Sequence, residues 1–291
     1  MTSPAQWVAG ARPRTLPAAV APVAVGTGAA VGVGGGAVLP ALLALVVSLA
    51  LQVAVNFAND YSDGVRGTDT DRVGPMRLVG SGAASPRAVL AATGVSFLIA
   101  AVAGVVLVVR SGRWELLAVG VLAVLAAWFY TGGRRPYGYA GLGEVAVFVF
   151  FGLVAVLGTT WTQAEVLGVG AWAGAVGVGA TACALLLVNN LRDIPTDADA
   201  GKRTLAVRLG DRLTRRLFVA LLLTPVVCTV VATLATPWAL VALPTAALAV
   251  RPARVVLGVA SGRALVPALG ASGAYGLAYG VLLGVGLALG R

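Results

Sequence analysis

Residues 38–57 read VLPALLALVVSLALQVAVNF, twenty consecutive positions without a charged side chain. A helix needs about 20 apolar residues to cross the hydrocarbon core of a bilayer. Comparable apolar runs lie near residues 15–31, 88–109, 116–130, 145–160, 171–191, 217–236, 238–250 and 266–289. The sequence therefore predicts an all-α fold, a polytopic membrane bundle of about nine helices. The run at 238–250 is short and contains Pro244, so eight spans remain an alternative.

The composition of the whole chain agrees with this assignment. Of its 291 residues, 59% are hydrophobic and 11% are charged, and the mean hydropathy is +0.93. Soluble domains carry about 25% charged residues. Because apolar runs occupy much of the length, we expect residues 1–291 to form a single integral membrane domain.

The histidine and cysteine content limits the kinds of catalytic and metal sites that the chain can form. The chain contains no histidine, which excludes Ser-His-Asp and Cys-His nucleophiles, His general bases and His-based metal sites. Cys183 and Cys228 both lie inside apolar runs, a placement that indicates small buried side chains rather than a disulfide or a zinc site.

The basic residues indicate the orientation in the membrane. The net charge is +10, but the basic residues lie between apolar runs, which is a topology pattern and not a nucleic-acid surface. With a cytoplasmic N-terminus, 18 of the 21 basic residues fall on the cytoplasmic side. By the positive-inside rule we expect a multi-pass protein of the plasma membrane with its N-terminus and active site in the cytoplasm.

Seven of the eleven acidic residues form two patches in long segments on that same side. The first patch contains Asp60, Asp63, Asp69 and Asp71, and the second contains Asp193, Asp197 and Asp199. An asparagine precedes each patch by four residues, Asn56 in the first and Asn189 in the second. Residues four and seven positions apart share a helix face. Pro195 disfavours helix at Ile194, so we expect the second helix to bend or end there.

Clustered acids near membrane helices are costly unless a cation neutralises them. Oxygen ligands from Asp and Asn suit Mg²⁺, which usually joins one or two carboxylates to substrate phosphates. The two patches are flanked by Arg66, Lys202 and Arg203. We therefore predict a diphosphate–magnesium clamp. Its metal ligands are Asn56, Asp60, Asp63, Asn189, Asp193 and Asp197. The four aspartates of this set are the predicted catalytic residues.

Two other interpretations remain. The acids could be solvated loop charges that balance the arginines, although two matching Asn-anchored clusters disfavour this. Intramembrane acids also mark ion pathways in transporters and channels. A cation pathway needs acids near mid-span, whereas these lie at helix ends beside bases that suit an anion.

The motifs NFANDYSD at 56–63 and NNLRDIPTD at 189–197 resemble the aspartate-rich motifs of the UbiA superfamily of intramembrane aromatic prenyltransferases. Three longer stretches narrow the resemblance: ANDYSDGVRGTD at 58–69, FYTGGRRPYGY at 129–139 and GKRTLAVRLG at 201–210. Together they look like the 1,4-dihydroxy-2-naphthoate polyprenyltransferases of menaquinone synthesis. Many relatives carry a third acid four residues after the second, where this chain has Gly67. The role of Asp69, the next acid, stays open.

The resemblance implies a nine-helix bundle, bound Mg²⁺ and a lateral opening for a lipid tail. It implies a reaction in which polyprenyl diphosphate ionises and 1,4-dihydroxy-2-naphthoate attacks, losing CO₂ and diphosphate to give demethylmenaquinone. The resemblance also implies that membrane lipid surrounds the bundle. Prenyltransferases that use 4-hydroxybenzoate, homogentisate or a tetrapyrrole are the alternatives within the family.

Several residues have secondary roles in this scheme. Relatives place a basic pair facing the diphosphate at the position of Arg134 and Arg135, although a topology role explains them equally well. Tyr130 is the candidate for the aromatic-substrate site, with an interfacial belt as the alternative. Tyr137 and Tyr139 are expected to be belt residues. Glu144 begins a span and could pair with Arg134 or Arg135.

Overall fold

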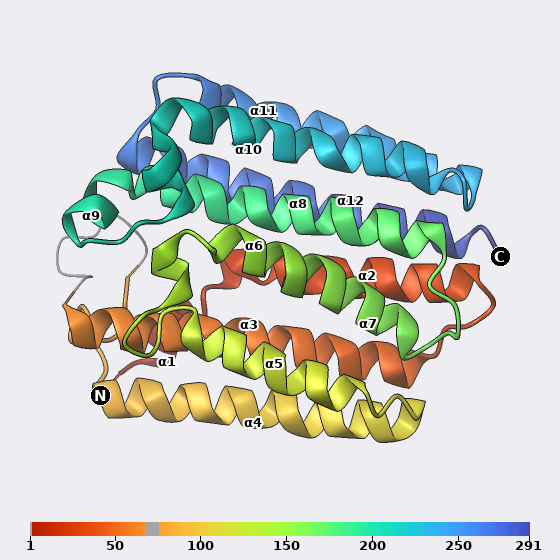
Figure 1. Ribbon diagram of the computed structural model, residues 1–291, viewed down its shortest axis with the longest axis horizontal. Helices are drawn as coiled ribbons and strands as arrows, with labels where there is room; N and C mark the ends of the chain where they lie inside the picture. The colour runs from red at the N-terminus through yellow and green to blue at the C-terminus, as the bar shows by residue number, and fades with distance from the viewer. Residues whose placement is uncertain (1, 68–75) are drawn as a thin grey trace.

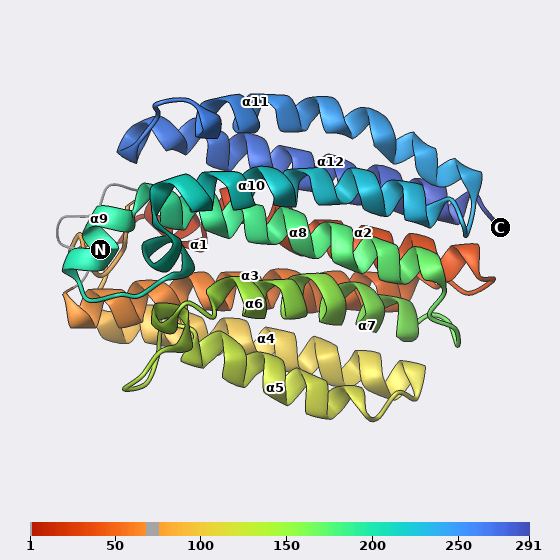
Figure 2. The same cartoon turned by 45° about the horizontal axis from the view of Figure 1, so that its top comes forward.

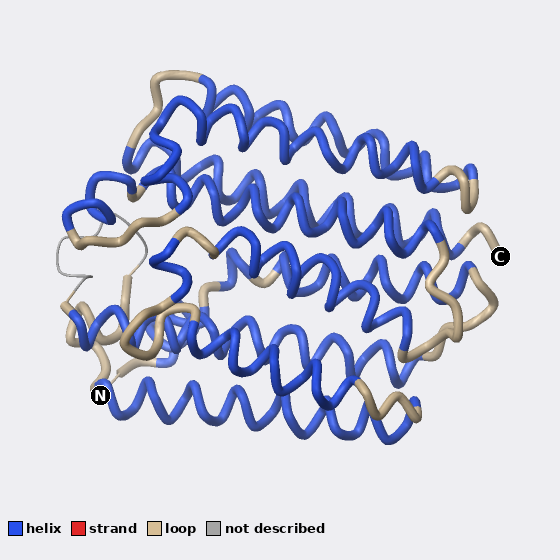
Figure 3. The backbone as a smooth tube through the Cα atoms, in the orientation of Figure 1, coloured by secondary structure: helices blue, strands red, loops and turns tan. Residues whose placement is uncertain are grey.

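The computed structural model describes residues 2–67 and 76–291. Within these ranges every regular element is helical (Figures 1 and 3). The α-helices are α1 (Pro4–Ala11), α2 (Pro17–Gly32), α3 (Val38–Arg66), α4 (Pro86–Ser111), α5 (Leu116–Phe129), α6 (Gly143–Val147), α7 (Ala155–Trp161), α8 (Val169–Arg192), α9 (Ile194–Asp199), α10 (Leu205–Ala232), α11 (Ala246–Leu257) and α12 (Val266–Ala288). Shorter 3₁₀ and π segments are η1 (Pro13–Thr15), η2 (Tyr137–Ala140), η3 (Phe148–Val154), η4 (Pro237–Thr245) and η5 (Gly262–Leu265).

Helices long and apolar enough to cross a membrane make up most of the described chain. Seven qualify by length and composition, and α1–η1 with α2 forms an eighth, bent by 50°. The ninth expected span, α5, is a shorter apolar helix. Large apolar side chains are exposed around the bundle, among them Leu98, Val121 and Val227. A surface of this kind suits lipid and not water, so the prediction of an all-α membrane bundle is confirmed, with seven or eight qualifying spans among the described residues and α5 as a shorter apolar helix.

Two helices extend beyond the apolar runs that predicted them. The run at 38–57 continues as α3 to Arg66, and the left-handed Gly67 (φ 72°) caps its end. The helix continues past Phe57 because its polar residues find buried partners there. The run at 217–236 begins twelve residues earlier as α10, where the Thr204 hydroxyl accepts a hydrogen bond from the Val207 amide. A glycine, Gly210 (φ 73°, ψ 169°), kinks this added part.

Small residues allow the central helices to approach closely. A Cβ on Gly28 of α2 would lie 1.9 Å from the carbonyl oxygen of Gly284 in α12. In the most apolar 18-residue stretch of each helix, 78% of the residues are buried in α8, against 22% in α3 and 33% in α4. Figure 2 shows α8 between the α10–α12 layer and the helices α3, α6 and α7. The helix that carries the second acidic motif is therefore the most buried of the spanning helices described.

The polar segments of the two acidic motifs meet at one end of this bundle. Figure 1 shows α9 at the same end as the N-terminus of the chain and the C-terminal end of α3. The loop between α5 and α6 also lies there. The opposite end holds the C-terminus and the link between α7 and α8.

Candidate active site

Asp63 is the residue at which the two motifs meet. Its Oδ1 lies 3.4 Å from the Lys202 ammonium nitrogen, and its Oδ2 lies 3.5 Å from Nη2 of Arg77. Tyr139 donates its hydroxyl hydrogen to the same carboxylate. All these charged side chains are buried. Because buried charges require partners, this group of four residues (the Asp63 cluster) ties α3 to η2 and to the segments that precede α4 and α10.

Asp60 has a different environment. Its side chain is fully buried, and its two oxygens accept hydrogen bonds from the backbone amides of Leu78 (2.7 Å) and Val79 (2.9 Å). Asp60 therefore anchors the chain between α3 and α4. A carboxylate oxygen has a second lone pair, so these bonds leave room for a metal, and the ligand role of Asp60 stays a prediction.

The asparagines of the two motifs also differ from one another. Asn56 is buried in a network: its amide nitrogen donates to Ala11 O (2.9 Å) and Thr15 Oγ1 (3.0 Å), while its oxygen accepts from Gln52. Asn189 is half-buried near the end of α8. The structure thus gives Asn56 a role in joining α3 to the N-terminal segment, and its role as a metal ligand stays a prediction.

The second motif occupies the junction of α8 and α9. As predicted from Pro195, α8 ends at Arg192 and a new short helix begins at Ile194. Arg192 binds Asp193 in a bidentate fashion, with both N···O distances at 2.6 Å, and its third nitrogen, Nη1, is buried without a hydrogen-bond partner among the described residues. The Lys202 amide donates to Asp197 O at 2.8 Å, which closes the turn and directs Lys202 towards Asp63.

Tyr139 corrects one expectation. It was expected to be an interfacial belt residue, but it belongs to the site. Its ring lies beneath Lys202 (4.6 Å to the centroid) and Arg66 (5.5 Å). Arg66 itself donates to the carbonyls of Thr131 and Gly133, so it also fixes the loop after α5. Cations over an aromatic face are stabilised by its quadrupole.

Sequence reasoning also missed Arg77, Arg192 and Tyr139 as members of the site. Arg77 and Arg192 had been counted only as topology charges. The position of Arg192 directly before Asp193 was a signal for pairing, whereas nothing in the local sequence indicates that Arg77 or Tyr139 reaches Asp63.

Tyr130 lies immediately after α5 and packs inward. Its ring meets that of Tyr137 edge-on at 5.6 Å, and its hydroxyl is 3.2 Å from the position that a Cβ on Gly143 would take. Burial raises the pKa of the Tyr137 hydroxyl to about 12, so it stays protonated and donates to Ala126 O. Tyr130 therefore lies against the start of α6, at the end of the bundle that carries the acidic motifs, and its contact with substrate stays a prediction.

The remaining predicted diphosphate ligands lie on the outside of this end. Arg134 and Arg135 are exposed in the loop after α5. Arg203 is exposed as well, although its backbone amide donates to Tyr139 O at 2.8 Å. Asp69 and Asp71 lie outside the described residues.

The donor chemistry of the site fits Mg²⁺ bound together with phosphate. Among the described residues no three acidic side chains gather around one point. Mg²⁺ does not need such a cage, because it commonly takes one or two carboxylates and completes its shell with water and substrate phosphates. Asp63 on one side can supply one carboxylate, and Asp193 and Asp197 on the other can supply two, so each side meets that requirement without a cage of three.

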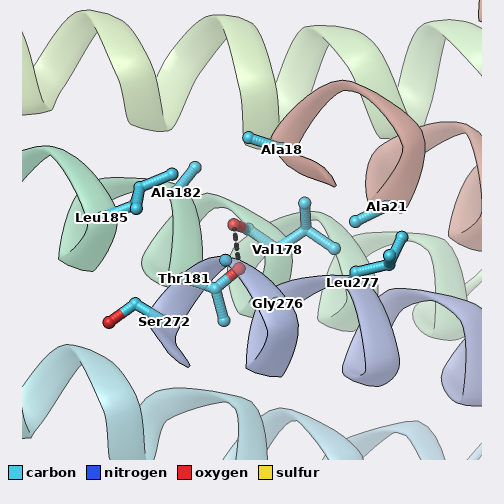
Figure 4. Close-up of a pocket in the computed structure, with 10 residues that line it drawn as sticks. Ala18, Ala21, Val178, Thr181, Ala182, Leu185, Ser272, Gly276 and Leu277 are labelled. Atoms are coloured by element: carbon cyan, nitrogen blue, oxygen red, sulfur yellow. Dashed lines mark hydrogen bonds between the residues drawn. The ribbon is translucent and has the colours of Figure 1, made fainter. Parts of the chain in front are cut away.

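A small recess lies deeper in the bundle, between α2, α8 and α12. Figure 4 shows its lining, which comes from Ala18, Ala21, Val178, Thr181, Ala182, Leu185, Ser272, Gly273, Gly276 and Leu277. The Thr181 hydroxyl is turned onto Val178 O at 2.8 Å, which leaves the wall mainly apolar.

The fold and the site define an integral membrane protein with a buried acid–base cluster at one end of a helical bundle. The chain belongs to the UbiA prenyltransferase family, whose family model matches residues 19–264. The 1,4-dihydroxy-2-naphthoate octaprenyltransferase of Mycobacterium tuberculosis is 55% identical over 100% of this chain and 99% of its own length.

Solved structures agree on the fold. The apo structure of a UbiA homolog from Aeropyrum pernix K1 has a TM-score of 0.70 at 18% identity and covers 93% of this chain and 97% of its own. A UbiA homolog from Archaeoglobus fulgidus bound to GPP and Mg²⁺ has a TM-score of 0.63 at 15% identity, covering 95% and 99%.

Proposed function

We propose that the protein transfers a polyprenyl chain from polyprenyl diphosphate to 1,4-dihydroxy-2-naphthoate, with loss of CO₂ and diphosphate. The product is demethylmenaquinone in its hydroquinone form. The observation that carries the proposal is the contact between Asp63 and Lys202, because it joins the two aspartate motifs into one site at the end of the bundle where α5 ends. The full-length relative in M. tuberculosis supports the choice of acceptor.

The diphosphate binds at the Asp63 cluster and the α8–α9 junction. Lys202 and Arg77 provide buried positive charge there, and the unpartnered Nη1 of Arg192 is a further donor for a phosphate oxygen. Preplaced cations stabilise the negative charge that develops as diphosphate leaves. Arg66, Arg134, Arg135 and Arg203 surround this end and attract the anion before it binds.

Mg²⁺ is proposed as the cofactor of this site. Asp63, Asp193 and Asp197 would hold it, with Asn56, Asn189 and Asp60 as the further predicted ligands. Bound Mg²⁺ neutralises charge on the diphosphate oxygens during departure. The homolog from Archaeoglobus fulgidus was solved with GPP and Mg²⁺, which supports divalent metal use in this fold.

The surrounding membrane completes the proposal. The prenyl chain lies among the apolar helices, where water is excluded from the allylic cation. By the positive-inside rule, the excess of basic residues at the acidic end supports a cytoplasmic location for that end, in a protein that we propose for the plasma membrane.

The test is purified protein in detergent or nanodiscs with Mg²⁺, one labelled polyprenyl diphosphate and one aromatic acceptor in each reaction. We expect prenylation of 1,4-dihydroxy-2-naphthoate, with CO₂ and diphosphate released in equal amounts. Prenylation of 4-hydroxybenzoate but not of the naphthoate would overturn the acceptor, and so would a product that keeps its carboxylate. If no acceptor is prenylated, the proposal that the protein is a prenyltransferase is wrong.

A further inference from the structure

A further buried carboxylate, outside the two aspartate motifs, is that of Glu144. Glu144 is the second residue of α6 and is 7% exposed. Its Oε1 accepts a hydrogen bond from Nδ2 of Asn190 at 2.9 Å, whereas Oε2 is buried without a hydrogen-bond partner among the described residues. It does not pair with Arg134 or Arg135, both of which are exposed.

The Oε2 atom of Glu144 therefore lacks a hydrogen-bond donor within the described part of the chain. A buried polar atom without a hydrogen bond costs about 1–3 kcal/mol, and more when the group is charged. A donor that reaches Oε2 during the reaction removes this cost. Asn190, on the buried α8, holds the other oxygen and so fixes the direction of Oε2.

The neighbours of Glu144 place it beside the proposed acceptor site. The Tyr130 side chain packs against Gly143, the residue before Glu144: a Cβ on Gly143 would lie 3.2 Å from the Tyr130 hydroxyl oxygen. On the other side, Cys183 of α8 donates to the Glu144 carbonyl at 3.1 Å. Tyr130, after α5, and Cys183 and Asn190, on α8, are thus polar side chains next to Glu144, and Asn190 is the one that bonds to its carboxylate.

We propose that Oε2 of Glu144 contacts the aromatic acceptor and acts as the general base that accepts its hydroxyl proton and later returns it. The inference rests on the proposed function, since it assigns a residue to the acceptor half of that reaction. The aspartate motifs act on the diphosphate, and none of them is free to take a proton from the ring without weakening its hold on the donor.

The proton transfer balances over the whole reaction. The hydroxyl next to the attacked carbon gives its proton to Oε2, and its electron pair becomes a carbonyl bond while the ring carbon bonds to C1 of the prenyl chain. The C1–O bond breaks, and its electrons leave with diphosphate. The substituted carbon then loses its carboxylate as CO₂, the electrons return to the oxygen, and Glu144 gives the proton back. No oxidant or outside proton is required.

The decisive variant is Glu144→Gln, which keeps an oxygen for Asn190 but cannot accept a proton. We expect the KM for polyprenyl diphosphate to change less than about threefold and kcat to fall by about 100- to 10,000-fold, the usual contribution of acid–base catalysis. The kcat of the variant should rise by about tenfold per pH unit between pH 7 and 9, because the acceptor then arrives already deprotonated. The wild type should show no such rise.

Glu165→Gln is the matched control, because Glu165 is exposed at the opposite end of the bundle between α7 and α8. If Glu144→Gln behaves like this control, or if its loss of activity is the same at every pH, the inference is wrong. If Glu144→Gln does not bind the donor, Glu144→Asp is measured instead. We expect the aspartate carboxylate to retain activity, at a rate that does not change between pH 7 and 9. A loss of activity as large as that of Glu144→Gln at every pH would show that Glu144 has only a packing role. Wild-type transfer to the naphthoate tests the proposed function separately.

Discussion

The Asp63 carboxylate and the Lys202 ammonium lie 3.4 Å apart, although 139 positions separate them in the sequence. Asp63 is in the last turn of α3, and Lys202 is in the short link between α9 and α10. Both side chains are buried, so the pair is shielded from the solvent screening that weakens surface ion pairs. This contact makes one site of two motifs that are far apart in the chain.

Lys202→Met should weaken donor binding. The change removes the buried charge that faces both Asp63 and the proposed diphosphate. Hydrogen bonds to charged groups contribute about 1.5–3 kcal/mol, so the KM for polyprenyl diphosphate should rise by about 10- to 100-fold. Steady-state kinetics with saturating acceptor measure this effect, and Lys202→Arg should recover part of it. An unchanged KM in Lys202→Met would remove Lys202 from the site.

Asp60→Ala should lower stability as well as activity. The substitution leaves the backbone amides of Leu78 and Val79 without their hydrogen-bond acceptor, and each lost bond lowers the free energy of unfolding by about 1–3 kcal/mol. Thermal unfolding in detergent should therefore shift down clearly, and Asp60→Asn, which keeps one acceptor oxygen, should shift less. Asp199→Ala, at an exposed position of α9, is the control. Equal unfolding temperatures for Asp60→Ala and the control would contradict the anchoring role.

Removal of divalent metal should stop prenyl transfer. Departure of diphosphate builds negative charge that Lys202 and Arg77 alone do not balance, so we expect EDTA to abolish product formation and added Mg²⁺ to restore it. Asp63→Asn should require more Mg²⁺ for half-maximal rate than the wild type. Asp211→Asn is the comparison, because its carboxylate is already paired with Arg215. Full activity in EDTA would exclude the magnesium proposal.

Cysteine labelling should reveal the orientation. The 18-to-3 division of basic residues predicts a cytoplasmic location for the α9 end. Ala200→Cys, exposed after α9, should react with a membrane-impermeant maleimide only in inverted vesicles. Val166→Cys, exposed between α7 and α8, should react in intact cells. Cys183 and Cys228 are buried and should stay silent. The reverse pattern would invert the topology.

Gly28→Ala should destabilise the contact of α2 with α12. The added Cβ would lie 1.9 Å from the Gly284 carbonyl oxygen, so one helix backbone must move. Over-packing of this kind typically costs about 1–3 kcal/mol, which should appear as a lower unfolding temperature. Gly94→Ala in α4 is the control, because no atom lies within 4 Å of its added Cβ. A normal unfolding temperature for Gly28→Ala would show that the two helices are farther apart.

Local sequence determined the helices of this protein. An uncharged run such as residues 38–57 must satisfy its backbone hydrogen bonds internally in lipid, so composition alone predicts a spanning helix. Pro195 likewise predicted the break between α8 and α9, because proline constrains the residue before it. The ends were less predictable. Charged residues after Phe57 suggested a loop, but α3 continues to Arg66 because Asp60 and Asp63 find buried partners.

The sequence by itself also determined that two Asn-anchored acidic motifs exist and that cations flank them. What each acid contacts was decided only by the tertiary structure. Asp60 binds backbone amides, Asp63 meets Tyr139 and Lys202, and Glu144 meets Asn190. Hydrogen bonds and ion pairs depend on distances of a few ångströms between atoms. Those distances follow from how α3, α6 and α8 pack against one another, which no spacing within a single helix specifies.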